Sequence, residues 1–82
     1  GPSHEAAYTL ERCIAVHHVA EVDYTCGRAP EHDHHQPAYF RFNSTDHVVL
    51  WGIPTNADNW EELRMDRILA ARDTGEEFTH TW

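Results

Sequence analysis

The sequence contains no lysine, few sulfur-containing residues and no long hydrophobic run. Its 82 residues include two cysteines and one methionine, and fourteen acidic residues outnumber six arginines to give a formal net charge of −8. Such an acidic chain repels phosphate backbones at long range, which disfavours general binding of duplex DNA or RNA. The absence of lysine beside frequent alanine, arginine, aspartate and glutamate is typical of a GC-rich, bacterial genome.

No stretch approaches the roughly 18 apolar residues that a membrane-spanning helix needs, and the N-terminus has no apolar signal-peptide segment. Two cysteines do not make a disulfide framework. We therefore expect a soluble, cytoplasmic protein without membrane contact. The opening residues GPSH have the appearance of a protease-cleavage and cloning scar, so residues 5–82 are expected to form one domain excised from a larger protein.

Apolar periodicity predicts one helix followed by short strands. Residues 5–18 carry apolar or small side chains at helical spacing, and Glu5 lies near the positive end of the helix dipole. Alternating apolar and polar residues predict strands. The predicted strands are 19–26, 38–43, 47–53, 60–68 and a last short strand within 69–82, with a turn at DTG. Glycine, proline and polar residues predict loops at 27–37 and 54–58.

The predicted order is thus one helix and then four or five antiparallel strands. The runs at 38–43 and 47–53 are separated by a short polar turn, so they are expected to pair as a hairpin. In so short a chain, closure of the sheet into a barrel removes the exposed strand edges. We therefore predict a mainly β fold with one N-terminal helix, arranged as a small SH3-like or Sm-like antiparallel barrel of about five strands.

The segment NWEELRMDRI resembles the C-terminal signature of the WYL domain, a bacterial regulatory module whose signature is usually written W-R-x-F-R-L-D-R-I. The residues that agree are Trp60, Arg64, Asp66, Arg67 and Ile68. Upstream, VVLWG resembles the family's naming motif, QPAYF resembles its strand after a proline, and RCIAVHHVAEVDY resembles its opening helix and first strand. The order and spacing of these blocks cover nearly the whole chain after GPSH.

Two departures from the family pattern concern the ligand chemistry. Val48 and Val49 stand where the family has its aromatic pair, and Glu61 stands where a basic residue is expected. The resemblance implies an SH3-like barrel that serves as a sensing or interaction module. Several family members are thought to bind nucleotides, oligonucleotides or single-stranded nucleic acid through arginines and a tyrosine.

Arginines and aromatic residues are the candidate binding groups, because guanidinium groups bind phosphate bidentately and aromatic rings stack on bases. The candidate ligand-binding residues are Arg41, Arg64, Arg67, Tyr39 and Tyr24, with Trp51 as a further stacking surface. The alternatives are that Asp66 pairs with an arginine as a structural clamp and that the aromatic residues pack in the core. Trp60 and Phe78 are predicted to be core residues.

Histidines and cysteines suggest zinc as a separate alternative. Cys13 and His17 lie four residues apart in the predicted helix, and Cys26 and the HDHH segment (His32, His34 and His35) follow it. A bound zinc ion would help a small domain to fold. However, the spacing matches no standard zinc finger. We expect no metal site and no cofactor, and a zinc-stabilised domain is the third hypothesis.

No catalytic motif such as G-x-S-x-G, H-E-x-x-H or a phosphate-binding glycine loop is present, so we do not expect an enzyme. The sequence instead predicts a regulatory binding module of a larger bacterial protein, which senses a nucleotide, an oligonucleotide or single-stranded nucleic acid. The alternative is a docking module that contacts other domains of the parent protein or forms a homodimer, without nucleic-acid binding.

Overall fold

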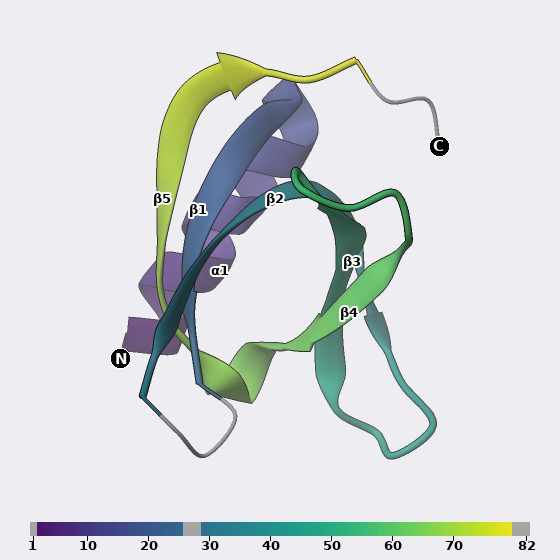
Figure 1. Cartoon of the computed structure of the whole chain (residues 1–82). Coiled ribbons are helices and arrows are strands. Elements are labelled where there is room, and N and C mark those ends of the chain that lie inside the picture. The colour runs from purple at the N-terminus through teal and green to yellow at the C-terminus, as the bar shows by residue number, and fades with distance from the viewer. Residues whose placement is uncertain (1, 26–28, 80–82) are drawn as a thin grey trace.

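The computed structural model describes residues 2–25 and 29–79. Its elements are α1 (Pro2–Val16), β1 (His18–Tyr24), β2 (Glu31–Phe42), β3 (Val48–Pro54), β4 (Glu61–Arg64), the 3₁₀ helix η1 (Met65–Arg67) and β5 (Ile68–Glu77). The strands form one strongly curved sheet of order β4-β3-β2-β1-β5, in which all neighbouring strands are antiparallel (Figure 1).

The predicted mainly β class with one N-terminal helix is confirmed, and so is the hairpin, because β2 pairs with β3. The predicted closure into a barrel is not observed. Within the described ranges, β4 and β5 are the two ends of the sheet, and η1 carries the chain from one end strand to the other (Figure 1).

α1 forms because alanine, leucine, glutamate and arginine favour helix, and Glu5 in its first turn interacts favourably with the helix dipole. The helix begins at Pro2, so it includes most of the segment that the sequence suggested to be a scar. It ends at Val16, because His17 adopts a left-handed conformation with φ 60° and its carbonyl accepts a hydrogen bond from the Phe78 amide at 2.9 Å. No helix in the described part of the chain is long and apolar enough to cross a membrane.

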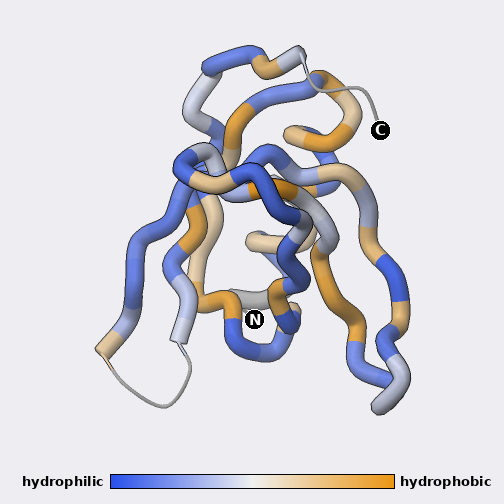
Figure 2. The backbone as a smooth tube through the Cα atoms, turned by 45° about the vertical axis from the view of Figure 1, so that its right-hand side comes forward, coloured by the Kyte–Doolittle hydropathy of each residue, from blue (hydrophilic) through white to orange (hydrophobic). Residues whose placement is uncertain are grey.

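The core lies between α1 and the inner, concave face of the sheet. Successive residues of a strand point to opposite faces of the sheet, so each strand has an inner and an outer face. Hydrophobic residues gather in several stretches of the strands, while other stretches are hydrophilic (Figure 2). The buried cluster consists of Ala6, Leu10, Cys13, Ala20, Val22, Tyr24, Leu50, Leu63, Met65 and Ile68. Leu10 and Leu50 are fully buried, and each such side chain contributes about 2 to 3 kcal/mol of transfer free energy.

The prediction of a loop at 27–37 is wrong, because β2 already begins at Glu31. The strand pairs with β1 from Glu31 to His35 and with β3 from His35 to Phe42. Pro37 lies next to a change of register between Pro37 and Tyr39, which is a bulge of the kind that accommodates proline within a sheet. Pairing with two neighbouring strands thus overrides the low strand propensity of this segment.

The end of the chain also differs from the prediction. The predicted strand at 60–68 is a strand only over Glu61–Arg64, because the chain then turns through η1 to reach the far side of the sheet. The predicted DTG turn is instead an irregularity within β5. The Asp73 carboxylate accepts a hydrogen bond from the Gly75 amide at 2.8 Å, and Gly75 has a φ of 76°. This local motif is a bulge in the pairing of β5 with β1, and the chain keeps its direction through it.

One histidine is a core residue. His35 is fully buried, and its two ring nitrogens have no hydrogen-bond partner in the part of the chain that the structure describes. Burial lowers the pKa of His35 to about 4, although the nearby Asp33 carboxylate acts in the opposite direction. Glu61 Oε1 lies 3.9 Å from His35 Nε2, and burial, with the charges of Asp33 and Glu31, raises the pKa of Glu61. The folded chain therefore holds His35 neutral at neutral pH.

This histidine should make the fold sensitive to mild acid. An unfolded chain protonates it below about pH 6.5, but the folded chain does so only near pH 4, so the unfolded state binds more protons in between. The free energy of unfolding should fall as the pH drops through this window, by up to roughly 3 kcal/mol. Urea denaturation at several pH values measures this effect. The free energy of unfolding should vary less with pH in His35→Leu than in the unchanged protein, whereas the exposed control His4→Leu should vary with pH as the unchanged protein does. An unchanged dependence for His35→Leu would contradict the assignment.

Gly52 is required by a close approach between β3 and β2. A Cβ atom at this position would lie 2.3 Å from the Gln36 carbonyl oxygen and 3.0 Å from Pro37 Cα, both of which are backbone atoms. Gly52→Ala should therefore lower the free energy of unfolding by about 1 to 3 kcal/mol or more. Thermal or urea denaturation would measure this loss. Ser44→Ala, at an exposed turn, should change stability by less than about 0.5 kcal/mol.

Candidate ligand-binding face

The outer face of β2, β3 and β4 brings together most of the predicted binding residues. Strand register arranges two rows across these strands, namely Arg41, Val49 and Arg64, and then Tyr39, Trp51 and Glu62. Cross-strand partners lie on the same face of a sheet. The intervening row of Phe40, Leu50 and Leu63 belongs to or packs on the core, so these two rows lie on the opposite, outer face. Within them Val49 is fully buried.

Three aromatic rings cluster on this face with Arg41. The ring centroids of Tyr39 and Trp60 are 6.2 Å apart, those of Trp51 and Trp60 are 6.0 Å apart, and the Arg41 guanidinium carbon lies 4.5 Å from the Trp51 ring centroid. The last distance is within the range of a cation–π contact. We call Tyr39, Arg41, Trp51 and Trp60 the aromatic–arginine cluster.

The cluster is open to solvent. Tyr39 is 45% exposed and Trp60 is 43% exposed, so the prediction of Trp60 as a core residue is wrong. Phe78, by contrast, is buried as predicted. Trp60 was misjudged because its position just before β4 carries no alternation signal, and only the fold places it beside Tyr39 and Trp51.

Arg64 lies on the same face but is already paired. Its Nε donates to Asp66 Oδ1 at 2.9 Å and its Nη2 donates to Asp66 Oδ2 at 2.5 Å. This bidentate pair lowers the pKa of Asp66 and raises that of Arg64. The alternative of a structural clamp is therefore realised for Arg64. Arg67 lies in η1, beyond the end of β4, and belongs to neither row.

Tyr24 is not on this face, because its ring is part of the buried core. Its hydroxyl group accepts a hydrogen bond from the backbone amide of Arg64 at 3.3 Å, and this bond connects β1 to β4 across the interior. The ring is therefore not accessible for stacking on a base.

The charge on this face is nearly balanced. Glu62 lies in the row of Tyr39 and Trp51 and is within 3.5 Å of the Asn43 side-chain amide, and Asp66 neutralises Arg64. Arg41 makes no ion pair with any residue in the described ranges. It is therefore the arginine of this face that is available to an anionic group.

A separate charged cluster covers the outer face of β1, β2 and β5. Arg72 donates hydrogen bonds to Glu21 and Asp23, while His32 contacts Asp23 at 2.5 Å and His34 lies 3.5 Å from Glu21. The bonds from Arg72 and His32 lower the pKa of Asp23 to about 2. These partners explain how a strand rich in histidine is accommodated in the sheet.

The residues of the zinc alternative are not brought together. Cys13 is buried in α1, where burial raises its pKa to about 11, and His35 faces the interior. His17 lies beyond the end of α1, and Cys26 lies outside the described residues. Among the residues that the structure describes, no three His, Cys, Asp or Glu side chains are arranged to hold a metal ion.

The hydrogen bond to Tyr24 predicts a stability effect. Tyr24→Phe retains the ring but leaves the Arg64 amide without its acceptor, so it should lower the free energy of unfolding by about 1 to 2 kcal/mol. Tyr8→Phe is a matched control, because Tyr8 is 75% exposed on α1. Urea denaturation should show almost no change for the control, and equal stabilities of the two variants would contradict the role of the bond.

Comparisons with protein-family models, with curated proteins and with solved structures found no match to this chain. The WYL resemblance therefore stays a prediction that rests on sequence motifs. In the structure, the RMDRI part of the motif spans the end of β4, η1 and the first residue of β5, and its Met65 and Ile68 lie in the core.

Proposed function

We propose that this chain is a non-enzymatic regulatory binding module of a larger bacterial protein, and that it recognises a nucleotide, an oligonucleotide or single-stranded nucleic acid. The observation that carries the proposal is the aromatic–arginine cluster. In it the Arg41 guanidinium group lies over the Trp51 ring, the half-exposed rings of Tyr39 and Trp60 lie beside that ring, and Arg41 has no carboxylate partner among the described residues. In this proposal the ligand contacts the aromatic–arginine cluster, and of the binding residues expected from the sequence Tyr24 and Arg67 are left out.

The aromatic rings would supply most of the affinity. Tyr39 and Trp60 each expose nearly half of their surface, and stacking of one base on such a ring contributes about 1 to 3 kcal/mol in single-strand binders. Paired bases of a duplex are not free to stack on a protein ring. The cluster therefore favours unpaired nucleotides, in agreement with the unfavourable net charge for duplex binding.

Phosphate binding would be limited to one or two groups. Arg41 is available, and Arg64 keeps N–H groups that Asp66 does not use. Neutralisation of one or two phosphates on a single strand predicts that affinity falls about three- to sevenfold between 50 and 200 mM salt. This dependence is weaker than that of proteins with an extended basic groove.

A second candidate function is docking of another domain of the parent protein or of a second copy of the chain. Half-exposed tyrosine and tryptophan rings beside an arginine are also the residues most enriched at protein interfaces, and Glu62 and Asp66 reduce the positive charge of this face. In this case the affinity would not require a phosphate group, and concentration-dependent mass in light scattering would reveal self-association.

The charge prediction concerns Arg41. In an NMR titration with a thymidine pentanucleotide at 50 mM salt, amide shifts should cluster at the aromatic–arginine cluster, and Arg41→Gln should weaken binding at least threefold. Arg12→Gln is the matched control, since it removes an exposed arginine from α1, and it should leave the affinity unchanged. No shift at millimolar oligonucleotide, or equal losses in both variants, would overturn the proposal.

The stacking contribution is tested in the same titration. Tyr39→Ala should weaken oligonucleotide binding about fivefold or more, whereas Tyr8→Ala, which removes an exposed ring from α1, should not. A protein that self-associates through the cluster, and loses this association in Tyr39→Ala without binding the oligonucleotide, would instead establish the docking function.

A further inference from the structure

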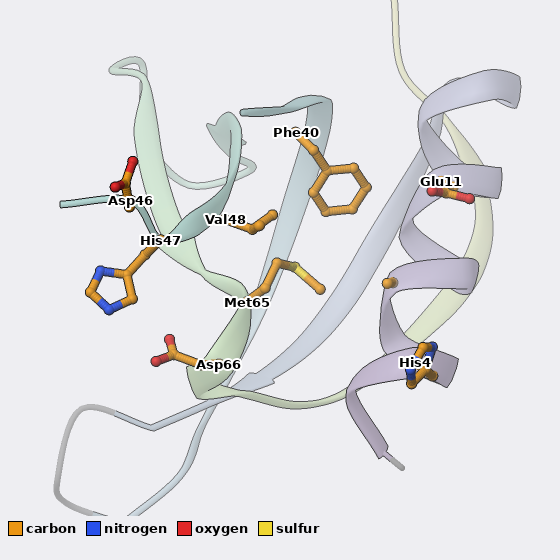
Figure 3. A pocket seen from close by; sticks show the side chains of 9 residues that line it. His4, Glu11, Phe40, Asp46, His47, Val48, Met65 and Asp66 are labelled. Atoms are coloured by element: carbon orange, nitrogen blue, oxygen red, sulfur yellow. The ribbon is translucent and has the colours of Figure 1, made fainter. Parts of the chain in front are cut away.

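A cavity of about 570 Å³ lies on the inner side of the sheet, away from the aromatic–arginine cluster. It is bounded by the first half of α1, the end of the β2–β3 hairpin and η1 (Figure 3). Phe40, Val48 and Met65 supply apolar surface from the sheet side, and Ala7 supplies it from α1. This volume is within the range of about 300 to 1,000 Å³ that is typical of small-molecule sites.

The polar groups at the edge of this cavity are mainly carboxylates. Glu11 and the imidazole of His4 lie on α1, and Asp46 and Asp66 lie on the opposite side together with the imidazole of His47 (Figure 3). Asp66 is neutralised by an arginine, but Glu11 and Asp46 form no ion pair with any residue within 2–25 and 29–79. An apolar cavity with two uncompensated carboxylates at its edge attracts a cation.

The turn of the β2–β3 hairpin fixes the backbone at Asp46, which carries one of these carboxylates. Asn43 Oδ1 accepts hydrogen bonds from the Thr45 amide at 2.9 Å and from the His47 amide at 3.0 Å, which closes the turn around Asp46. Asp46 has a φ of 61°, a left-handed conformation that aspartate and asparagine tolerate better than most residues. The turn thus fixes the backbone of Asp46 at the edge of the cavity.

We infer that this cavity binds a small organic cation, namely a primary amine carried on an aryl or alkyl body. The apolar body would contact Phe40 and Met65, whose aromatic ring and thioether suit such a group. The ammonium group would lie at the edge of the cavity near Glu11, and the negative charge of Asp46 on the opposite side would add to its attraction. The same carboxylates would repel an anion. This site takes a different ligand from the one proposed for the outer face, and each is tested independently of the other.

The inference is tested by NMR titration of the whole chain with three probes of similar shape: 2-phenylethylamine, 2-phenylethanol and 3-phenylpropionate. The amine should bind at least fivefold more tightly than the carboxylate, with the alcohol between them. Its amide shifts should map to the cavity residues of α1, to 46–48 and to 65–66. Equal affinities for the amine and the carboxylate, or shifts that map elsewhere, would overturn the inference.

Variants separate the site from general charge effects. Glu11→Gln with Asp46→Asn should weaken amine binding about two- to tenfold, whereas Glu76→Gln with Asp58→Asn makes the same charge change at exposed positions outside the cavity and should not. Ala7→Leu should fill part of the cavity and reduce binding of both the amine and the alcohol. Amine binding that survives both changes, or a response to a lysine-containing peptide with none to the amine, would exclude a small-cation site.

Discussion

The packing of α1 against the inner face of the sheet is the contact on which the rest of the molecule depends. A chain of this length has only one small core, and Leu10 of α1 and Leu50 of β3 lie at full burial in the same cluster. On the inner face, α1 packs against β5, β2 and β1. Ala7, which is smaller than Leu10, leaves space between the helix and the hairpin, and that space is the cavity. The outer face is therefore the surface on which the ligand of the proposed function would bind.

A single bulge in β2 decides which side chains reach that outer face. Before the bulge His35 pairs with the core residue Ala20, so odd-numbered residues face inward. After it Phe40 pairs with the core residue Leu50, so even-numbered residues face inward. The extra residue between Pro37 and Tyr39 thus turns Tyr39 and Arg41 outward. The same bulge buries a histidine at one end of the strand and exposes an arginine at the other.

The bulge also limits what the sequence pattern could predict about which residues share a face of the sheet. Strict alternation correctly predicted that residues 38–43 form a strand of the hairpin with two distinct faces. Helical spacing over residues 5–18 correctly predicted the helix but extended it too far, because α1 ends at Val16 and His18 already belongs to β1. Alternation holds only within one unbroken stretch, so it could not relate His35 to Tyr39 across a bulge. The contact of Trp60 with Tyr39 depends on the order of strands in the sheet, and no local pattern contains this order.

Most residues of the RMDRI motif stabilise the fold and are not free to contact a ligand. Its apolar residues Met65 and Ile68 lie in the core, and the Arg64 guanidinium group is held by Asp66 at the point where β4 turns into η1. An anionic ligand would have to compete with that carboxylate or share the guanidinium with it. Arg41 has no such competitor among the described residues and is instead held over the Trp51 ring. In the proposed function of this acidic chain, affinity for a nucleotide would then come mainly from the rings, and the charge of Arg41 would select a ligand that carries both a base and a phosphate.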